Sequence, residues 1–474
     1  MPSRGTSPNP TLKAWSTLHE QIRFARLNPH SNEYCQAALG EPIILAPVST
    51  PRTVRLATAS LVGTTLEYYD FAVYSTLAAL VFNRLFFPSF DPLSGTILAL
   101  STFAVGYLAR PIGGVICGNL GENFGRRFVL VTTLVVMGTT TAMIGLLPTY
   151  ESAGILAPIL LVVLRFVQGA ALGGEWAGAV LLCVEHGSDA QRGRNGAWTQ
   201  VGPALGTLMA TGLLAWITAV LSPAEFQAWG WRLPFLASVL LVIFGLWIRR
   251  GVAETPVYQE LDRRQLKSQA PISEVVKLHW RGLLRVIGVR LGPDVWYSLV
   301  VVFSLSYLAT VLGLPRPLAL ISLSIGLVFN VLSEVFFGAL SDRLGRRAVY
   351  GAGVVLTMMW VFAFFVLLDT RQPLLITLAI VVALIAHAMM YGPQAAFITE
   401  QFPTRVRFAG SSMAYTLAGL VGGGIAPAIF ATLLREFKTP FSIALYAAGA
   451  LTITGIVLWF SRETAHASHF SSKD

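Results

Sequence analysis

Ionisable side chains interrupt long apolar stretches of this sequence, and some of these side chains could bind and release a proton. Glu67 and Asp70 are three positions apart, so a helix would place both carboxyl groups on one face. A charge in hydrocarbon costs about 2.5 to 3.5 kcal/mol, so one that is kept usually faces water or a partner. The two acids could therefore carry a proton, or Asp70 could be an ionised structural partner of Arg165 or Arg110. Both interpretations stay open from the residues alone.

Arginines in the same kind of stretch could bind an anion. A guanidinium group is always charged and offers two parallel N–H groups to a carboxylate. Arg165 lies deep in its stretch, one turn before Gln168, and could bind an anionic substrate or neutralise an acid. Glu175 and Trp176 follow on the same predicted helix, and we expect Glu175 to pair with Arg110.

The second half of the chain carries similar groups. Arg290 and Asp294 stand at i and i+4, and such a pair reduces its own cost of burial, so a structural role is as plausible as binding. His387 is suited to a proton relay, although a histidine bonded between helices is equally common. The candidates for proton coupling are Glu67, Asp70, Asp294 and His387. The candidates for substrate binding are Tyr74, Arg110, Arg165, Gln168, Glu175, Trp176, Arg290 and Tyr297.

The elements that must position these residues are transmembrane helices. The chain is 54% hydrophobic and 12% charged, whereas soluble domains are about 25% charged. A spanning helix needs about 20 apolar residues. We expect an all-α integral membrane protein with twelve such helices, at about 54–82, 95–118, 127–147, 154–181, 194–220, 231–249, 284–311, 318–340, 348–368, 373–399, 408–432 and 440–461.

Basic residues fall in alternate loops, which predicts that both termini and the central loop face the cytoplasm. The net charge of +10 then reflects membrane topology and not a nucleic-acid partner. Cys35, Cys117 and Cys183 have no metal-binding spacing and are interpreted as packing residues. The expected parts are a polar tail at 1–51 with a short amphipathic helix or a flexible extension, a first bundle at 52–250, a loop at 251–283, a second bundle at 284–462 and a tail at 463–474.

An internal repeat predicts that the two bundles arose by duplication. Residues 118–127 read GNLGENFGRR and residues 338–347 read GALSDRLGRR, each after the second helix of its half.

At this repeat the sequence resembles the major facilitator superfamily, whose inner loop has the pattern G-x-x-x-D-R-x-G-R-R. The second copy matches fully, whereas the first has Glu122 for the acid and Asn123 for the first arginine. Other segments resemble the metabolite:proton symporter branch, which includes shikimate, 2-oxoglutarate, citrate and proline/betaine carriers. They are GTTLEYYDF from Gly63, ARPIGG from Ala109, RFVQGAALGGEWAGA from Arg165, WGWRLPF from Trp229 and AETPVYQE from Ala253.

The resemblance implies two pseudo-symmetric six-helix bundles that work by alternating access. It also implies a charge clasp that gates the cytoplasmic side and that is weaker or differently partnered in the first half, because Asn123 replaces arginine. The gating candidates are Gly118, Glu122, Gly125, Arg126, Arg127, Gly338, Asp342, Arg343, Gly345 and Arg346.

The sequence therefore predicts a secondary transporter that carries a small organic acid with a proton, as a monomer in the cell inner membrane. Arg165, assisted by Arg110 or Arg290, would bind the anion, and Glu67, Asp70 or Asp294 would take the proton. The alternatives are a carrier of zwitterions such as proline or betaine, and a non-transporting membrane sensor. No cofactor is expected, and the absence of P-loop, H-E-x-x-H and G-x-S-x-G motifs argues against an enzyme.

Overall fold

The computed structural model describes residues 50–90, 92–250 and 253–465. Its regular elements in these ranges are helices. The expectations for the N-terminal tail, including its short helix and Cys35, lie outside the described residues. Cys117 and Cys183 are both buried, in agreement with their interpretation as packing residues.

The first half consists of helices that correspond to the six expected spans. They are α3 (Thr50–Leu77), continued by the π-helix η1 (Ala78–Phe82) and α4 (Asn83–Phe86); α5 (Pro92–Phe124); α6 (Arg126–Gly145); α8 (Leu156–Leu172) with α9 (Glu175–His186); α10 (Arg192–Gln200) with α11 (Gly202–Val220); and α13 (Leu233–Arg250). The short helices α7 (Tyr150–Ala153) and α12 (Pro223–Ala228) lie in its loops.

The second half repeats this order. Its helices are α16 (Trp280–Tyr297), continued by η4 (Ser298–Phe303), α17 (Ser304–Ser306) and η5 (Tyr307–Val311); α18 (Arg316–Leu344); α19 (Arg346–Asp369); α20 (Pro373–Thr399); α21 (Arg407–Gly419), continued by η7 (Leu420–Gly424) and α22 (Ala426–Phe437); and α23 (Phe441–Trp459). Ten helical segments of the described chain are long and apolar enough to cross a membrane, and α3 and α5 supply the other two spans of the fold.

The central segment is more ordered than the expected loop, because it contains α14 (Pro256–Arg263) and α15 (Pro271–Leu278). Both helices begin with a proline, and the Thr255 hydroxyl accepts a hydrogen bond from the Tyr258 N–H at the start of α14. Their polar sequences give no hydropathy signal. The segment links the two halves of the chain, and the prediction did not include these two helices.

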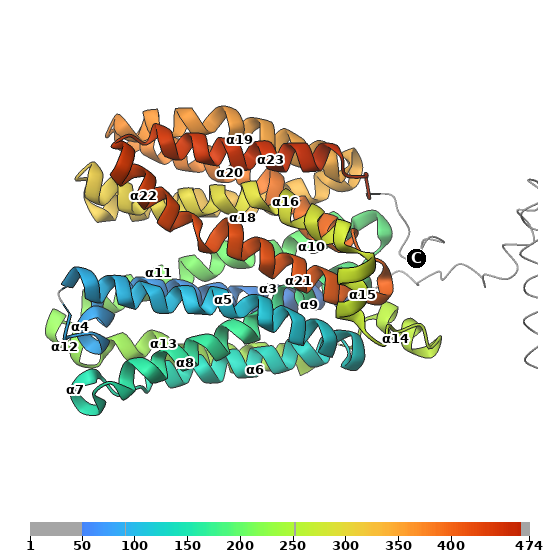
Figure 1. The fold of residues 1–474 in the computed structure, drawn as a ribbon, viewed down its shortest axis with the longest axis horizontal. Coiled ribbons are helices and arrows are strands. Elements are labelled where there is room, and N and C mark those ends of the chain that lie inside the picture. The colour runs from blue at the N-terminus through green and yellow to red at the C-terminus, as the bar shows by residue number, and fades with distance from the viewer. Residues whose placement is uncertain (1–49, 91, 251–252, 466–474) are drawn as a thin grey trace, which may run out of the picture. The chain divides into compact units, whose positions relative to one another are not determined.

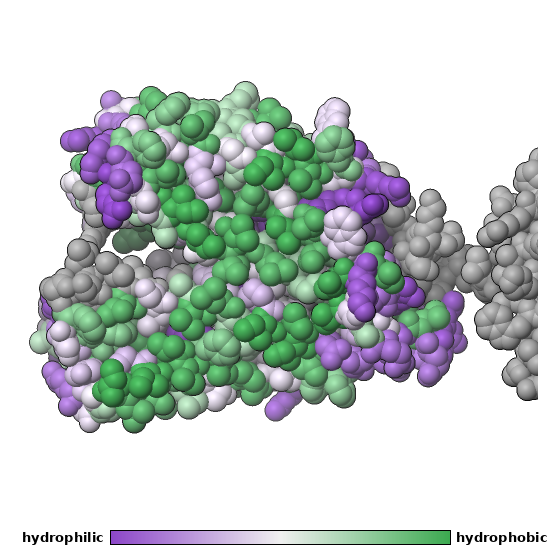
Figure 2. Space-filling view, in the orientation of Figure 1, coloured by the Kyte–Doolittle hydropathy of each residue, from purple (hydrophilic) through white to green (hydrophobic). Residues whose placement is uncertain are grey.

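The two halves lie side by side, with the first half drawn blue to green and the second yellow to red (Figure 1). They meet where α5 packs on α21 and where α10 packs on α18 and α20. Large apolar side chains such as Leu240, Trp247, Leu332 and Val366 are exposed on the outside, as expected for a lipid-facing surface, and Figure 2 shows apolar residues along both halves.

One end of the molecule, here called the charged end, carries α14, α15 and the two repeated loops with Arg126 and Arg346. At the opposite end Figure 2 shows a hollow between the halves. The halves are therefore closed against each other at the charged end and separated at the other.

Glycines let α5 and α8 approach closely enough to bring the charged residues together. A Cβ atom on Gly169 would lie 2.1 Å from the Gly106 carbonyl oxygen, and one on Gly113 would lie 1.7 Å from that of Ala170. Only glycine fits such a crossing. The crossing places Arg110 of α5 beside the part of α8 that carries Arg165.

Candidate functional site

The first element of the candidate site is a buried ion pair between α3 and α5. The Glu67 Oε1 atom lies 3.1 Å from an Nη2 atom of Arg110, and Glu67 is 2% exposed. The guanidinium group also lies over the rings of Tyr107 and Phe71, at 4.7 and 5.3 Å from their centroids. Contacts with an acid and with aromatic rings restrict the orientation of a guanidinium group.

A second pair lies entirely within the first half. Asp70 is 3.4 Å from Arg165, so Arg165 and not Arg110 is its partner. The Gln168 amide donates to the Asp70 carboxylate and, at 2.7 Å, to Thr141 Oγ1. The Arg165 guanidinium lies 3.6 Å from the Tyr74 ring centroid. All these residues come from the first half, so the group stabilises that half.

The third pair comes from the second half. Asp294 lies 2.9 Å from Arg290, as the i, i+4 spacing predicts. Arg290 also donates to the Tyr415 carbonyl oxygen at 2.6 Å, and its guanidinium lies 3.2 Å from the Tyr415 ring centroid. On its other face Tyr415 stacks on Trp176 at 3.8 Å and 10°, and Trp176 donates to Gln200 Oε1 at 2.8 Å. This stack joins the two halves.

The first and third pairs face each other across the two halves. Glu67 lies within electrostatic range of Arg290, and Asp294 lies within range of Arg110. Two acids and two arginines, contributed equally by the two halves, thus form one charged cluster. Such a cluster can contact one solute from both halves.

The predicted pair between Glu175 and Arg110 was wrong. Glu175 forms an ion pair with Arg249 at the end of α13 and accepts a hydrogen bond of 2.6 Å from Thr133. The three partners come from α9, α13 and α6, so Glu175 lies inside the first half. Sequence position gave its depth in the membrane, but not the neighbouring helix that it faces.

A ring cluster extends the site within the second half. The His387 ring lies 4.9 Å from the rings of Tyr297 and Tyr391, and the Tyr391 hydroxyl is 3.4 Å from that of Tyr415. His387 is 2% exposed. The cluster connects the predicted residues His387 and Tyr297 to the Arg290 pair.

The repeated loops bind the opposite half by capping a helix. The Glu122 carboxylate accepts hydrogen bonds from the backbone N–H groups of Phe408 and Ala409, at 2.8 and 3.3 Å, where α21 begins. At the equivalent position of the other repeat, Asp342 accepts hydrogen bonds from the backbone N–H groups of Gly193 and Arg194 at the start of α10, at 2.8 and 2.9 Å. Helix N-termini have unpaired N–H groups and positive charge, so each acid holds the two halves together.

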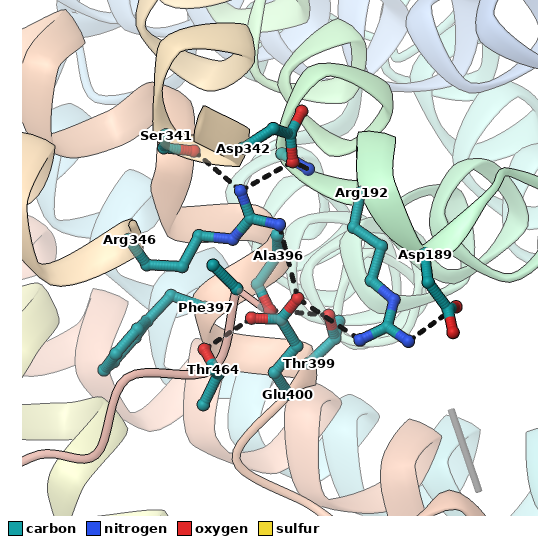
Figure 3. A network of polar contacts seen from close by, with 12 residues as sticks. Asp189, Arg192, Ser341, Asp342, Arg346, Ala396, Phe397, Thr399, Glu400 and Thr464 are labelled. Atoms are coloured by element: carbon teal, nitrogen blue, oxygen red, sulfur yellow. Dashed lines mark hydrogen bonds and ion pairs between the residues drawn. The ribbon is translucent and has the colours of Figure 1, made fainter. Parts of the chain in front are cut away.

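Arginines reinforce these two contacts. Arg126 lies 3.1 Å from Glu122 and 3.7 Å from Glu185. Its counterpart Arg346 lies 2.7 Å from Asp342 and 3.5 Å from Glu400 (Figure 3). Figure 3 also shows Arg192 of the first half between Glu400, at 3.6 Å, and Asp189, at 2.6 Å. The network therefore spans both halves at the charged end.

The second arginine of each GRR sequence binds the end of the last helix in its own half. Arg127 donates to the Arg250 carbonyl and Arg347 to that of Trp459. Arg343, a gating candidate, is exposed and forms no ion pair with any described residue. Asn123 contacts Asn119, while its carbonyl oxygen accepts from Tyr258. Neither Asn123 nor Arg343 therefore contributes an ion pair between the halves in the described part of the chain, and the two clasps use equivalent acids and arginines, Glu122 with Arg126 and Asp342 with Arg346.

Two further acids cap the helices that follow the repeated loops. Glu254 accepts from the backbone N–H of Arg127, and Glu463 accepts from those of Arg346 and Arg347. Partial burial raises the pKa of Glu463, but these N–H donors outweigh it and hold the pKa below its ordinary value. Sequence reasoning missed both acids, although their shared Glu-Thr dipeptide after the sixth and twelfth helices was a usable signal.

Tyr415, Tyr391 and Gln200 were also missed. Tyrosine and glutamine are common enough in apolar helices that no spacing distinguishes them. Their position became evident only from the packing of α9, α10, α20 and α21 around the site.

The fold and the buried charge cluster between its halves define the protein as a secondary membrane transporter. Residues 56–278 match the family Sugar (and other) transporter, and residues 294–474 match the Major Facilitator Superfamily. The chain belongs to the major facilitator superfamily, in its metabolite:proton symporter branch, and so has twelve transmembrane helices.

Two relatives and one solved structure illustrate this placement. The chain is 38% identical to the shikimate transporter of Escherichia coli K12, over 89% of this chain and 97% of the relative. It is 32% identical to the proline/betaine transporter of the same strain, over 86% and 83%. The fold matches the proton:xylose symporter XylE bound to 6-bromo-6-deoxy-D-glucose with a TM-score of 0.71, at 17% identity, covering 88% of this chain and 97% of XylE.

Proposed function

We propose that the protein carries a small organic acid together with a proton, and that Arg110 and Arg290 bind the carboxylate. The observation that carries this proposal is the cluster in which the Glu67–Arg110 and Asp294–Arg290 pairs face each other across the halves. Arg165 is a weaker candidate for substrate binding than expected, because Asp70, Gln168 and Tyr74 of its own half surround it.

Charge balance supports proton coupling. Each of the two facing arginines has an acid within 3.1 Å. A substrate carboxylate can therefore bind an arginine only if the ion pair between that arginine and its acid breaks. Protonation removes the negative charge of the acid and frees one guanidinium group. One proton bound thus allows one carboxylate to bind, and an anion without a proton would compete with a buried carboxylate.

The alternative substrate is a zwitterion such as betaine, which a relative at 32% identity is named for. A fixed cation prefers open aromatic faces together with an acid. In this structure the protein's own arginines cover one face each of Tyr74, Tyr107 and Tyr415. This occupation favours the organic acid.

We further propose that the protein is monomeric, lies in the cell inner membrane and has its charged end and both termini in the cytoplasm. The support is the concentration of arginines in the loops of the charged end, as the positive-inside rule requires.

Transport into proteoliposomes tests the proposal. We expect labelled shikimate, or another small organic acid from a panel, to accumulate when the outside is more acidic, and to equilibrate without accumulation when the gradient is collapsed. Uptake of every acid in the panel that is indifferent to the gradient would show that proton coupling is wrong. Gradient-driven uptake of glycine betaine that no organic acid inhibits would establish the alternative.

A further inference from the structure

One acid in the interior has no arginine. Glu334 of α18 is 1% exposed, its Oε2 atom has no hydrogen-bond partner, and it forms no ion pair with any residue that the structure describes. Glu67, Asp70 and Asp294, by contrast, each lie within 3.4 Å of a guanidinium group. Glu334 therefore differs from every acid that was expected to carry the proton.

The surroundings of Glu334 are polar but uncharged. One turn earlier, Asn330 donates to the Leu384 carbonyl at 2.9 Å, and its own Oδ1 has no partner among the described residues. On α20, a Cβ atom at Gly392 would lie 2.5 Å from the Glu334 carbonyl oxygen, so the two backbones touch at this level. On α16, Tyr297 lies within electrostatic range of Glu334.

No described cation faces Glu334 from the helices packed against α18. The titratable groups on α20 are His387 and Tyr391, which belong to the ring cluster with Tyr297. The arginines of α10 and α19 lie at the charged end, where Arg192 and Arg346 pair with the acids shown in Figure 3. Tyr350 of α19 donates to the Val289 carbonyl.

A carboxylate in this environment would be costly. Removing an ionised group from water costs several kcal/mol unless a partner charge and hydrogen bonds replace the lost hydration. Glu67 and Asp294 have such partners, so their ionised forms are compensated. Glu334 has none in this conformation, and its neutral acid is the form that the surroundings can accommodate.

We propose that Glu334 is the proton-carrying residue of the second half: it holds a proton while the charged end is closed and loses it when the halves rearrange. The proton is taken from water on the open side by the carboxylate and is released to water on the other side. The rings of Tyr297, His387, Tyr391 and Tyr415 lead from Tyr297, which is within electrostatic range of Glu334, to Arg290, so loss of the proton can influence the anion site. This role rests on the proposed function.

Infrared spectroscopy tests the protonation without any substrate. We compare the wild type with Glu334→Gln in liposomes at neutral pH, with Glu436→Gln as the control, because Glu436 is an exposed acid of the same half. The wild type should show a carbonyl band of a protonated carboxylic acid that Glu334→Gln lacks and Glu436→Gln retains. An unchanged spectrum in Glu334→Gln would overturn the proposal, since it would mean that Glu334 is ionised and is a candidate ligand for a cation.

Transport separates this proposal from the previous one. Glu334→Gln mimics the protonated acid permanently, so it should still exchange internal for external shikimate but should accumulate less shikimate than the wild type under the same pH gradient. A variant that accumulates shikimate as the wild type does would also overturn the role of Glu334. If the wild type itself ignores the gradient, the proposed function fails, while the infrared result still decides the protonation of Glu334.

Discussion

At the scale of single residues, the orientation of guanidinium groups decides what the site can bind. Arg110 is held between an acid and two aromatic rings, and Arg290 between an acid and the Tyr415 ring. Each is a flat, charged fork within electrostatic range of the acid of the opposite half. A lysine has the same charge but neither the fork nor the stacking face.

We therefore expect Arg110→Lys to weaken the binding of a carboxylate substrate. Hydrogen bonds to charged groups contribute about 1.5 to 3 kcal/mol, so the loss of one bond of the fork should raise KM for shikimate uptake about tenfold or more. Initial uptake rates against substrate concentration give this value. Arg84→Lys, at an exposed position, is the control and should leave KM unchanged. An unaltered KM in Arg110→Lys would exclude Arg110 from the binding site.

The same scale shows what sequence can predict about such a site. Glu67, Asp70, Arg165 and the Arg290–Asp294 pair could be identified because a charge within an apolar run is rare and expensive. The intrahelical pair was predicted, and Arg165 was one of two partners considered for Asp70, but the Glu67–Arg110 pair was not predicted. Glu175 faces Arg249 because α9 and α13 both pack against α6, and that packing is a property of the whole bundle.

At the scale of elements, the duplicated loop is a turn whose glycine and acid act together. Gly125 and Gly345 have φ values of 100° and 96°, which side chains other than glycine rarely adopt. Each stands at the start of a helix, and the carboxylate of Glu254 or Glu463 caps that helix by accepting hydrogen bonds from its first N–H groups. The repeat of the whole arrangement explains why the glycine stands at the same place in both loops.

Gly345→Ala should accordingly destabilise the protein. The added Cβ would lie 2.7 Å from Glu463 Oε2, in a backbone conformation (φ 96°, ψ 151°) that costs about 1 to 3 kcal/mol for a residue other than glycine. We expect a lower apparent Tm of the purified protein in detergent. Gly449→Ala is the matched control, because it lies within α23 and its Cβ would have no atom within 4 Å. Equal melting of the two variants would refute the strain at Gly345.

Elements also differ in how far sequence could define them. The twelve spans follow from hydropathy, but the interruptions within them do not. One expected helix breaks between α8 and α9, where a Cβ on Gly173 would lie 2.2 Å from the Gly114 nitrogen. Close packing against α5 determines that break. The short helices α14 and α15 were missed for a different reason, because polar helices of eight residues have no apolar run.

At the scale of the whole molecule, two reciprocal caps hold the charged end closed. Each half contributes one acid, Glu122 or Asp342, and one helix N-terminus, so both contacts must break before the end can open. The hollow at the opposite end shows the complementary arrangement (Figure 2). Alternating access then requires that the two ends exchange these states, and the stability of the caps sets how often the charged end opens.

This reasoning makes Asp342→Asn a test of the rocking motion. The asparagine lacks the charge that Asp342 offers to the N–H groups of Gly193 and Arg194 and to Arg346. Since a bond to a charged group contributes about 1.5 to 3 kcal/mol, the open population should rise about tenfold or more. Ala197 is 0% exposed and lies against Gly338 at this interface, so Ala197→Cys reports opening through its rate of maleimide labelling.

The labelling rate of Ala197→Cys should rise in the Asp342→Asn background and stay the same in Asp369→Asn, which changes an exposed acid away from the repeated loops. The native Cys117 and Cys183 are buried, and the protein without Ala197→Cys measures their contribution. Equal labelling rates in both backgrounds would mean that the cap does not limit opening. A rate increase with Asp342→Asn alone would locate the barrier to rocking at the helix N-terminus where Asp342 binds, because Asp369→Asn removes the same charge without touching that contact.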